Sequence, residues 1–240
     1  MAVAAAADAG AVIVAAGRGA RAGGPESEPK QYRLIAGVQM LLRAIRPFAR
    51  HPRVGAIVVV LPPADASRPP EWLAPLLSDR LRVAAGGEMR QQSVANGLAQ
   101  LGPEARLVLV HDAARPFVDA DLIDRVLAVA ALGACAVPGM PLTDTLKETD
   151  TAGLVVRTVP RERLVAVQTP QAFPRTLLEN AHQRARADSG LAQATDDAAL
   201  CERLGYPVRV VPGSPRNFKV TTAADFILAD ALAAGEGPAA

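Results

Sequence analysis

Ala11-Val-Ile-Val-Ala-Ala-Gly-Arg-Gly-Ala-Arg-Ala-Gly-Gly24 is the stretch that determines the fold. Residues 11–15 form a short apolar run rich in β-branched side chains, which predicts a buried parallel strand. The next residues, as far as Pro29-Lys-Gln31, are rich in glycine and proline and predict a long loop rather than a helix. Ligands bind at the carboxyl ends of strands in open α/β sheets, so we expect a binding site at this loop.

The composition of this loop favours phosphate binding. Glycines allow backbone N–H groups to approach an anion closely, and Arg18, Arg21 and Lys30 add positive charge. The alternative is an ordinary basic surface loop, but an ordered loop of this length usually has a function. The loop is therefore the first candidate for a phosphate site.

Two widespread glycine motifs do not explain the loop. Residues 17–22 match the dinucleotide motif G-x-G-x-x-A, which requires a helix within the motif and an acidic residue about twenty positions further on. The Gly-Gly-Pro at 23–25 would block that helix, and no carboxylate lies between Glu28 and Asp65. The Gly-Lys-Ser/Thr of a Walker loop is absent from the sequence. A dinucleotide-dependent reductase is thus excluded, and a phosphate site here must use another scheme.

Length and composition indicate a globular chain with a sizeable core. Its 240 residues could form one large or two small domains, and 50 % of them are apolar but only 3 % aromatic. A net charge of +2 implies no strong field for nucleic acid. No apolar run is long enough to cross a membrane, and the amino-terminal segment lacks the features of a signal peptide. Two distant cysteines, Cys135 and Cys201, indicate a reduced, cytoplasmic protein.

Apolar runs that predict strands alternate with segments of helical periodicity. Such alternation predicts an α/β fold in which helices cover a mostly parallel sheet. Asp119, Thr195 and Thr222 are expected to cap the helices that follow them, and Gly133 and Gly205 to end two helices. The expected strands lie at 11–15, 57–61, 81–85, 107–110, 135–137 and 208–211, and the expected helices at 38–48, 72–77, 91–101, 120–132, 175–189, 196–204 and 223–234.

The alternation breaks between residues 141 and 163. Two runs that contain threonine and valine, 143–149 and 154–159, flank Asp150-Thr-Ala-Gly153 and predict a β-hairpin. Mixed polarity on both faces indicates an arm that projects from the sheet, and a two-stranded arm would be stabilised by packing on a partner subunit. Residues 165–168 are expected to return to the core. We expect a single domain over residues 1–240 with this embedded arm, and no fused downstream enzyme.

Polar residues that could carry chemistry follow the predicted strands. Asp112 and Arg115 come directly after the fourth strand, at the sheet edge where the glycine loop begins. A carboxylate there could hold Mg²⁺ together with phosphate oxygens, or it could pair with Arg115. Lys219 alternates with apolar neighbours and could point into a site or into solvent.

Further candidates have simple structural alternatives. Gly86-Gly87-Glu88 offers backbone groups that could read a base edge, and Ser93 could add a hydroxyl, but a tight turn would explain them as well. Arg161 could be a solvated surface residue, and Thr169 could belong to a turn only. The three histidines do not have the spacing of zinc ligands. The sequence also contains no G-x-S-x-G elbow, so hydrolase chemistry is not supported.

Several of these segments match a known family. Ala15-Ala-Gly-x-Gly-x-Arg21, followed by Pro29-Lys-Gln31, resembles the signature of nucleotidyltransferases that join a sugar phosphate to a nucleotide. From about residue 11 to 229, the chain resembles the 2-C-methyl-D-erythritol 4-phosphate cytidylyltransferases of non-mevalonate isoprenoid synthesis. The motifs that narrow the match are Val110-His-Asp-Ala-Ala-Arg-Pro-Phe117, Thr143-Asp-Thr-Leu-Lys147, Gln168-Thr-Pro-Gln171, Thr195-Asp-Asp197 and Asn217-x-Lys-Val-Thr221.

This resemblance implies a Rossmann-like enzyme that binds CTP and Mg²⁺ and forms a homodimer through the arm. In the family scheme the substrate phosphate attacks the α-phosphorus of CTP, and pyrophosphate leaves. Arg21 and Lys30 would stabilise charge on the CTP phosphates, Lys219 would neutralise the α-phosphate, and Asp112 would ligate Mg²⁺.

The remaining family positions fall on two groups of residues. The positions that bind the nucleotide correspond to Ala15, Ala16, Gly17, Gly19, Gly86, Gly87, Glu88, Ser93 and Ala113. The positions that bind the sugar phosphate, some of them contributed across the dimer, correspond to Arg115, Asp144, Thr145, Arg161, Thr169 and Thr195.

The chain departs from the family pattern within the glycine loop. Ala22 replaces the usual methionine, the interval from Arg21 to Lys30 is longer, and Glu26 and Glu28 add negative charge. Two other functions remain open from the sequence: a cytidylyltransferase for ribitol phosphate or another polyol phosphate, and a non-catalytic nucleotide-binding domain. Retention of three cations and Asp112 argues against the second, because binding alone would not require all of them.

Overall fold

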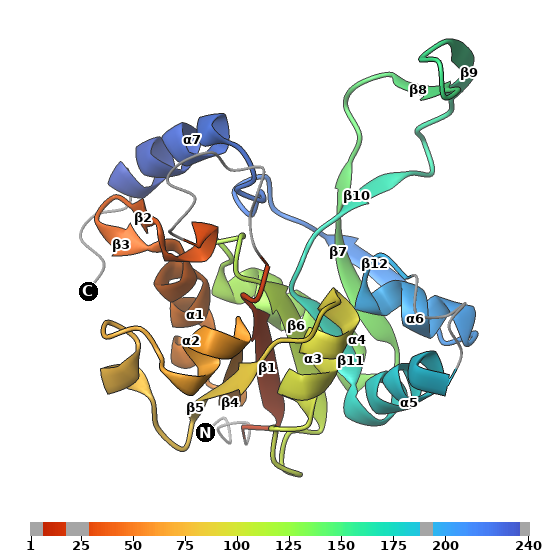
Figure 1. Ribbon diagram of the computed structural model, residues 1–240. Coiled ribbons are helices and arrows are strands. Elements are labelled where there is room, and N and C mark those ends of the chain that lie inside the picture. Colours follow the sequence, from red (N-terminus) through yellow and green to blue (C-terminus); the bar gives the residue numbers. More distant parts are fainter. Residues whose placement is uncertain (1–6, 18–28, 188–193, 236–240) are drawn as a thin grey trace, which may run out of the picture.

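A twisted sheet crosses the molecule with helices on both faces, as the computed structural model shows for residues 7–17, 29–187 and 194–235 (Figure 1). The described strands form one eight-stranded sheet and two small hairpins. The predicted Rossmann-like α/β class, with a mostly parallel sheet, is confirmed.

The parallel part of the sheet supports the glycine loop. Its order is β6 (Leu107–Asp112), β1 (Ala9–Val14), β4 (Val54–Leu61) and β5 (Leu81–Ala85). All three pairings are parallel, and the last residues of β1 and β6 stand opposite each other in register. The carboxyl ends of these strands therefore lie at one edge, where the sequence predicts the site.

The other part of the sheet is partly antiparallel. An unpredicted strand, β11 (Gln171–Pro174), lies between β6 and β7 (Cys135–Pro141) and runs antiparallel to both. Two further strands, β12 (Val208–Pro212) and β10 (Val165–Val167), pair with β7. The expected return of residues 165–168 to the core is wrong for β10, whose three residues are exposed because they lie at the end of the sheet.

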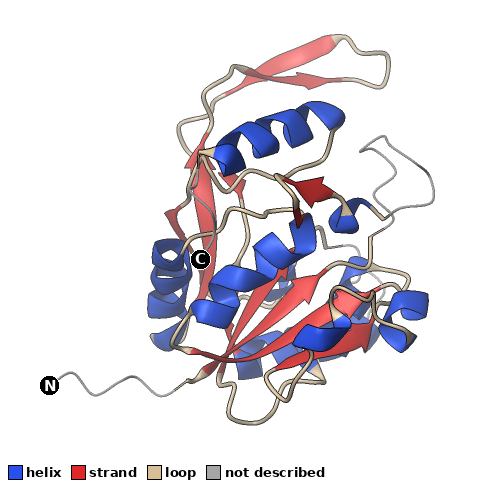
Figure 2. Cartoon of the chain, turned by 90° about the vertical axis from the view of Figure 1, so that its left-hand side faces the viewer, coloured by secondary structure: helices blue, strands red, loops and turns tan. Residues whose placement is uncertain are grey.

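Helices cover the two faces of the sheet (Figure 2). One face packs against α1 (Met40–Arg50) and α4 (Ala120–Ala131). The opposite face packs against α3 (Arg90–Leu98), α5 (Arg175–Ala187) and α6 (Asp197–Arg203). The strands are apolar on both faces because neither face meets water.

The central strand β1 shows why this packing needs small side chains. Ile13 points into the core beneath α1 and α4, whereas Val12 points toward α3. A Cβ at Gly97 of α3 would lie 2.6 Å from Cγ1 of Val12 and 2.8 Å from Cγ2 of Val60. Glycine at this position thus brings α3 close to the strands that end at the site.

A smaller layer lies above the carboxyl edge of the sheet. It contains α7 (Ala223–Ala234), the hairpin of β2 (Leu34–Ile35) with β3 (Val38–Gln39), and the 3₁₀ turn η2 (Lys30–Tyr32). Thr222 caps α7 as predicted, with its side chain accepting from the Asp225 N–H.

Several predicted boundaries differ from the structure. The first helix begins at Met40 rather than at 38, because residues 38–39 pair with β2. Asp196, not Thr195, caps α6, since its carboxylate accepts from the Ala199 N–H. The expected helix at 72–77 contains only the 3₁₀ turn η3 (Ala74–Leu76), and α2 (Pro63–Ser67) forms where the sequence suggests only a connection.

The predicted hairpin arm is present. Its strands β8 (Leu146–Thr149) and β9 (Val155–Val159) pair only with each other among the described strands and project beyond the sheet (Figure 1). Apolar side chains near the tip are exposed, including Leu154 at 68 % and Val156 at 61 %. The described arm therefore has no core of its own.

Candidate active site

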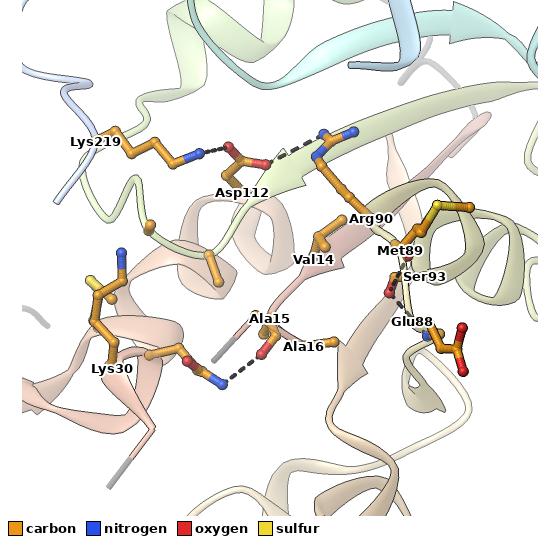
Figure 3. Close-up of a pocket in the computed structure, with 16 residues that line it drawn as sticks. Val14, Ala15, Ala16, Lys30, Glu88, Met89, Arg90, Ser93, Asp112 and Lys219 are labelled. Atoms are coloured by element: carbon orange, nitrogen blue, oxygen red, sulfur yellow. Dashed lines mark hydrogen bonds and ion pairs between the residues drawn. The ribbon is translucent and has the colours of Figure 1, made fainter. Parts of the chain in front are cut away.

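A pocket of about 290 Å³ opens at the carboxyl ends of β1, β5 and β6 (Figure 3). Strand ends, the turn after β5, the start of α3 and the segment before α7 all contribute to its wall. The lining residues are Val14, Ala15, Ala16, Gly17, Lys30, Gln31, Met40, Gly87, Glu88, Met89, Arg90, Ser93, Asp112, Ala113, Ala114 and Lys219.

Asp112 lies between two cations in this pocket. As the last residue of β6, it accepts from Lys219 Nζ at 2.7 Å through one carboxylate oxygen and from Arg90 at 3.4 Å through the other. Burial alone would raise the pKa of Asp112, but the charges of Arg90 and Lys219 outweigh burial and hold the pKa well below its usual value. The carboxylate is ionised, and its partners are Lys219 and Arg90 rather than Arg115, the alternative that the sequence left open.

Arg90 is a site residue that the sequence predictions missed. It opens α3, and its guanidinium donates to Asp197 at 2.6 Å as well as to Asp112. Burial would lower the pKa of Arg90, but the two carboxylates outweigh that effect and raise it. One sequence signal could have identified Arg90: it closely follows Gly86-Gly87-Glu88, a segment already proposed for the site. Its partner Asp197 belongs to the Thr195-Asp-Asp197 motif, which was also noted.

The far end of the glycine loop is attached to the sheet edge. Lys30 Nζ donates to the Val220 carbonyl at 2.7 Å, and the Gln31 side-chain amide donates to the Ala15 carbonyl at 2.6 Å. These bonds bring the residues on either side of the loop together in the pocket wall. Gly19 and Arg21 lie outside the described residues.

The turn after β5 approaches β1 closely. A Cβ at Gly86 would lie 2.3 Å from the Ala16 Cβ, so only glycine allows this contact. The Gly87 N–H donates to Ser93 Oγ at 3.1 Å, and the Glu88 N–H donates to Gln92. The structure places Gly87, Glu88 and Ser93 in the pocket wall and Gly86 directly behind it.

Arg115 and Thr169 lie beside the pocket rather than in its wall. Thr169 Oγ1 accepts from the Asp112 N–H at 3.0 Å and lies 3.1 Å from His111 Nδ1. Arg115 donates to the Asn217 carbonyl at 2.9 Å. Burial lowers the pKa of His111 to about 4, so this ring is neutral near pH 7 and supports the turn around Asp112.

The other predicted substrate residues do not line the pocket. Asp144, Thr145 and Arg161 lie at the base of the arm and are exposed, and the Arg161 guanidinium donates to the Thr143 carbonyl. Thr195 is exposed just before α6. The described chain thus places most of the predicted nucleotide positions in the pocket wall, with Gly86 behind it and Gly19 outside the described residues, and leaves these four outside the pocket.

The chemistry of the pocket suits a polyphosphate. Lys30, Arg90 and Lys219 supply cations, and the turn at Gly86 and Gly87 brings backbone groups close to β1. Transfer of a phosphoryl group requires positioning and positive charge more than a protein nucleophile. His111 is neutral, does not line the pocket, and bonds within the protein.

Comparison with known proteins identifies the family of the chain. Residues 9–234 match the family model described as IspD, 2-C-methyl-D-erythritol 4-phosphate cytidylyltransferase. The chain belongs to this cytidylyltransferase family. The match spans almost the whole chain and confirms the resemblance that the motifs indicated.

Relatives and solved structures agree with family membership. A Solibacter usitatus protein named 2-C-methyl-D-erythritol 4-phosphate cytidylyltransferase is 42 % identical over 91 % of this chain and 92 % of its own length. The crystal structure of the Thermus thermophilus cytidylyltransferase matches with a TM-score of 0.77 and 38 % identity, covering 93 % of this chain and 98 % of that one. A Rhizobium rhizogenes protein named "Bifunctional enzyme IspD/IspF" is 46 % identical over 92 % of this chain, which spans about half of that protein's length, 55 %.

A carboxylate in the pocket wall has the chemistry that Mg²⁺ requires. The described residues contain no group of three or more His, Cys, Asp or Glu side chains that could hold a metal ion. Mg²⁺ bound with a nucleotide, however, needs only one or two carboxylates, because phosphate oxygens and water complete its shell. Ionised Asp112 in the pocket wall fits that requirement.

Among the described helices, none is long and apolar enough to span a membrane.

Proposed function

We propose that the chain joins CTP and 2-C-methyl-D-erythritol 4-phosphate to give 4-diphosphocytidyl-2-C-methyl-D-erythritol and pyrophosphate, in non-mevalonate isoprenoid synthesis. The observation that carries this proposal is the Lys219–Asp112–Arg90 cluster at the end of β6, in a member of this family. The cluster sets an ionised carboxylate and two cations beside the glycine turns that would receive a nucleotide.

The proposed reaction is an in-line displacement. A phosphate oxygen of methylerythritol phosphate attacks the α-phosphorus of CTP, a new P–O bond forms, and the bond to pyrophosphate breaks. Lys219 neutralises the α-phosphate, and Arg21 and Lys30 stabilise the charge that develops on the leaving phosphates. The attacking phosphate is already ionised, so no general base is needed.

The nucleotide would lie along the pocket wall. Ala15, Ala16, Gly17, Gly19 and Ala113 would bind the nucleotide, and Gly86, Gly87, Glu88 and Ser93 would read cytosine and ribose. Asp112 would ligate Mg²⁺, which would supply charge neutralisation on the triphosphate. Support comes from the close approach of Gly86 to Ala16 and from the ionised state of Asp112.

The sugar-phosphate site and the assembly belong to the same proposal. The chain would form one domain that works as a cytoplasmic homodimer, with arms at about residues 141–163 packed on each other. Arg115 and Thr169 would act beside the chain's own pocket, and Asp144, Thr145, Arg161 and Thr195 would complete the sugar-phosphate site, some across the dimer. The exposed apolar side chains of Leu154 and Val156 support packing of the arm on a partner.

One assay tests the activity. Pyrophosphate release is measured with CTP, GTP, UTP and ATP, each in combination with methylerythritol phosphate and with ribitol 5-phosphate, with and without Mg²⁺. We expect release from CTP with methylerythritol phosphate only when Mg²⁺ is present. Preference for ribitol phosphate would assign the chain to a different polyol substrate, and absence of release with every pair would contradict an enzymatic role.

A further inference from the structure

The two cations beside Asp112 are held in different ways. The Lys219 side chain is 44 % exposed and reaches Asp112 from the segment before α7. The Arg90 side chain is 29 % exposed and bonds a second carboxylate, that of Asp197, at 2.6 Å (Figure 3 shows Arg90 and Lys219 on opposite sides of Asp112). One cation of the site is therefore partly exposed, and the other is anchored by a second carboxylate.

The anchor of Arg90 lies outside the pocket. Asp197 is the first residue of α6, and its side chain has no exposed surface. One carboxylate oxygen bonds Arg90, and the other lies 2.9 Å from His182 Nε2 of α5. A buried carboxylate that lost its cation would be strongly unfavourable, so Asp197 keeps the Arg90 guanidinium in one place.

We infer that Arg90 is a positioning residue for Asp112, held in place by the buried carboxylate of Asp197 with support from His182. This inference rests on the proposed function. When Lys219 turns from Asp112 to the α-phosphate, Arg90 still neutralises and orients the carboxylate. These contacts run from α5 and α6 to the end of β6, and they link two helices that do not line the pocket to the geometry of the reaction.

The inference predicts a particular kinetic signature. Loss of an outer residue that orients an essential carboxylate typically lowers activity about tenfold to hundredfold. Asp197 does not line the pocket, so Asp197→Asn, which keeps the shape and removes the charge, should lower kcat by about that factor. The KM for CTP should change much less, because the effect falls on the geometry of the transition state.

A double-mutant experiment tests the chain of contacts. Arg90→Gln should lower kcat about as much as Asp197→Asn, and the double variant should be no slower than Arg90→Gln alone. The double variant should also unfold at a higher temperature than Arg90→Gln, since Arg90→Gln leaves the Asp197 charge buried without the Arg90 cation. The matched control is Arg53→Gln, which breaks an ion pair outside the pocket and should leave kcat unchanged. In that pair the Arg53 guanidinium lies 2.9 Å from the Asp8 carboxylate.

The outcomes separate the inference from the proposed function. Wild-type kcat in Asp197→Asn, additive losses in the double variant, or a tenfold rise in the KM for CTP with kcat unchanged in Arg90→Gln would each overturn the positioning role. The last result would make Arg90 a direct phosphate ligand. A wild-type chain without activity would contradict the proposed function instead, and the order of unfolding temperatures would then test the Arg90–Asp197 pair independently.

Discussion

The pocket and the arm are built on opposite principles. The pocket lies at the ends of buried parallel strands, where Asp112 has its backbone in the sheet, its carboxylate between two cations, and a threonine hydroxyl on its N–H. The arm is a two-stranded ribbon whose residues are mostly exposed and whose strands pair with each other. The described pocket residues are held by contacts within one chain, whereas the arm strands pair only with each other among the described strands and leave apolar side chains exposed.

The largest effect is expected from Lys219, the more exposed of the two cations beside Asp112. Lys219→Ala should lower kcat roughly 10²–10³-fold, because charge that develops at the α-phosphorus would lose the cation proposed to neutralise it. The KM for CTP should change less, and circular dichroism should show an intact fold. Steady-state kinetics measures the change, with Lys147→Ala as the lysine control from the arm, where Lys147 bonds Thr158. Near-wild-type turnover in Lys219→Ala would contradict its role.

Removal of the arm tip tests the other side of the comparison. Deletion of residues 150–153 should weaken dimerisation while the thermal unfolding midpoint of the body stays close to wild type, because the described arm strands pair only with each other. Light scattering measures the first effect and calorimetry the second. An unchanged dimer would exclude the arm tip as the interface.

A smaller effect should follow from filling the close contact behind the pocket. Gly86→Ala would place a Cβ 2.3 Å from the Ala16 Cβ, so the turn or β1 must move, and we expect a loss of about 1–3 kcal/mol in stability together with weaker CTP binding. Gly10→Ala is the matched control, since its Cβ would meet Leu101 in the core at 2.8 Å. It should lose stability without loss of CTP affinity in calorimetric titration. Equal CTP affinity in Gly86→Ala would show that this contact does not shape the nucleotide site.

The smallest effect is expected at a helix cap of the body. Asp119 caps α4 by accepting from the Leu122 N–H at 2.7 Å. Asp119→Ala should lower the free energy of unfolding by about 1 kcal/mol. Chemical denaturation measures it, and the dimer equilibrium of the arm should not change. A larger fall in dimer affinity than in stability would show that body and arm are coupled.

Much of this fold could be predicted because local patterns agree with tertiary structure. Apolar runs located β1, β4, β5 and β6, and the caps at Asp119 and Thr222 were correct, since strand burial and capping depend on neighbouring residues. The antiparallel strand β11 was missed because it has only four residues and one of them is a proline. Only the position of this segment between β6 and β7 makes it a strand.

The same distinction applies to the site. From the sequence alone came the glycine-rich strand end, the carboxylate of Asp112, the lysine at 219 and the hairpin arm, because residue types and spacing carry those features. Only the tertiary structure brought Arg90 between Asp112 and Asp197, which lie far apart in the chain. It also placed Asp144, Thr145 and Arg161 outside the pocket of their own chain. Ion pairs between distant segments depend on how helices pack over a sheet, and no local pattern in the sequence encodes that packing.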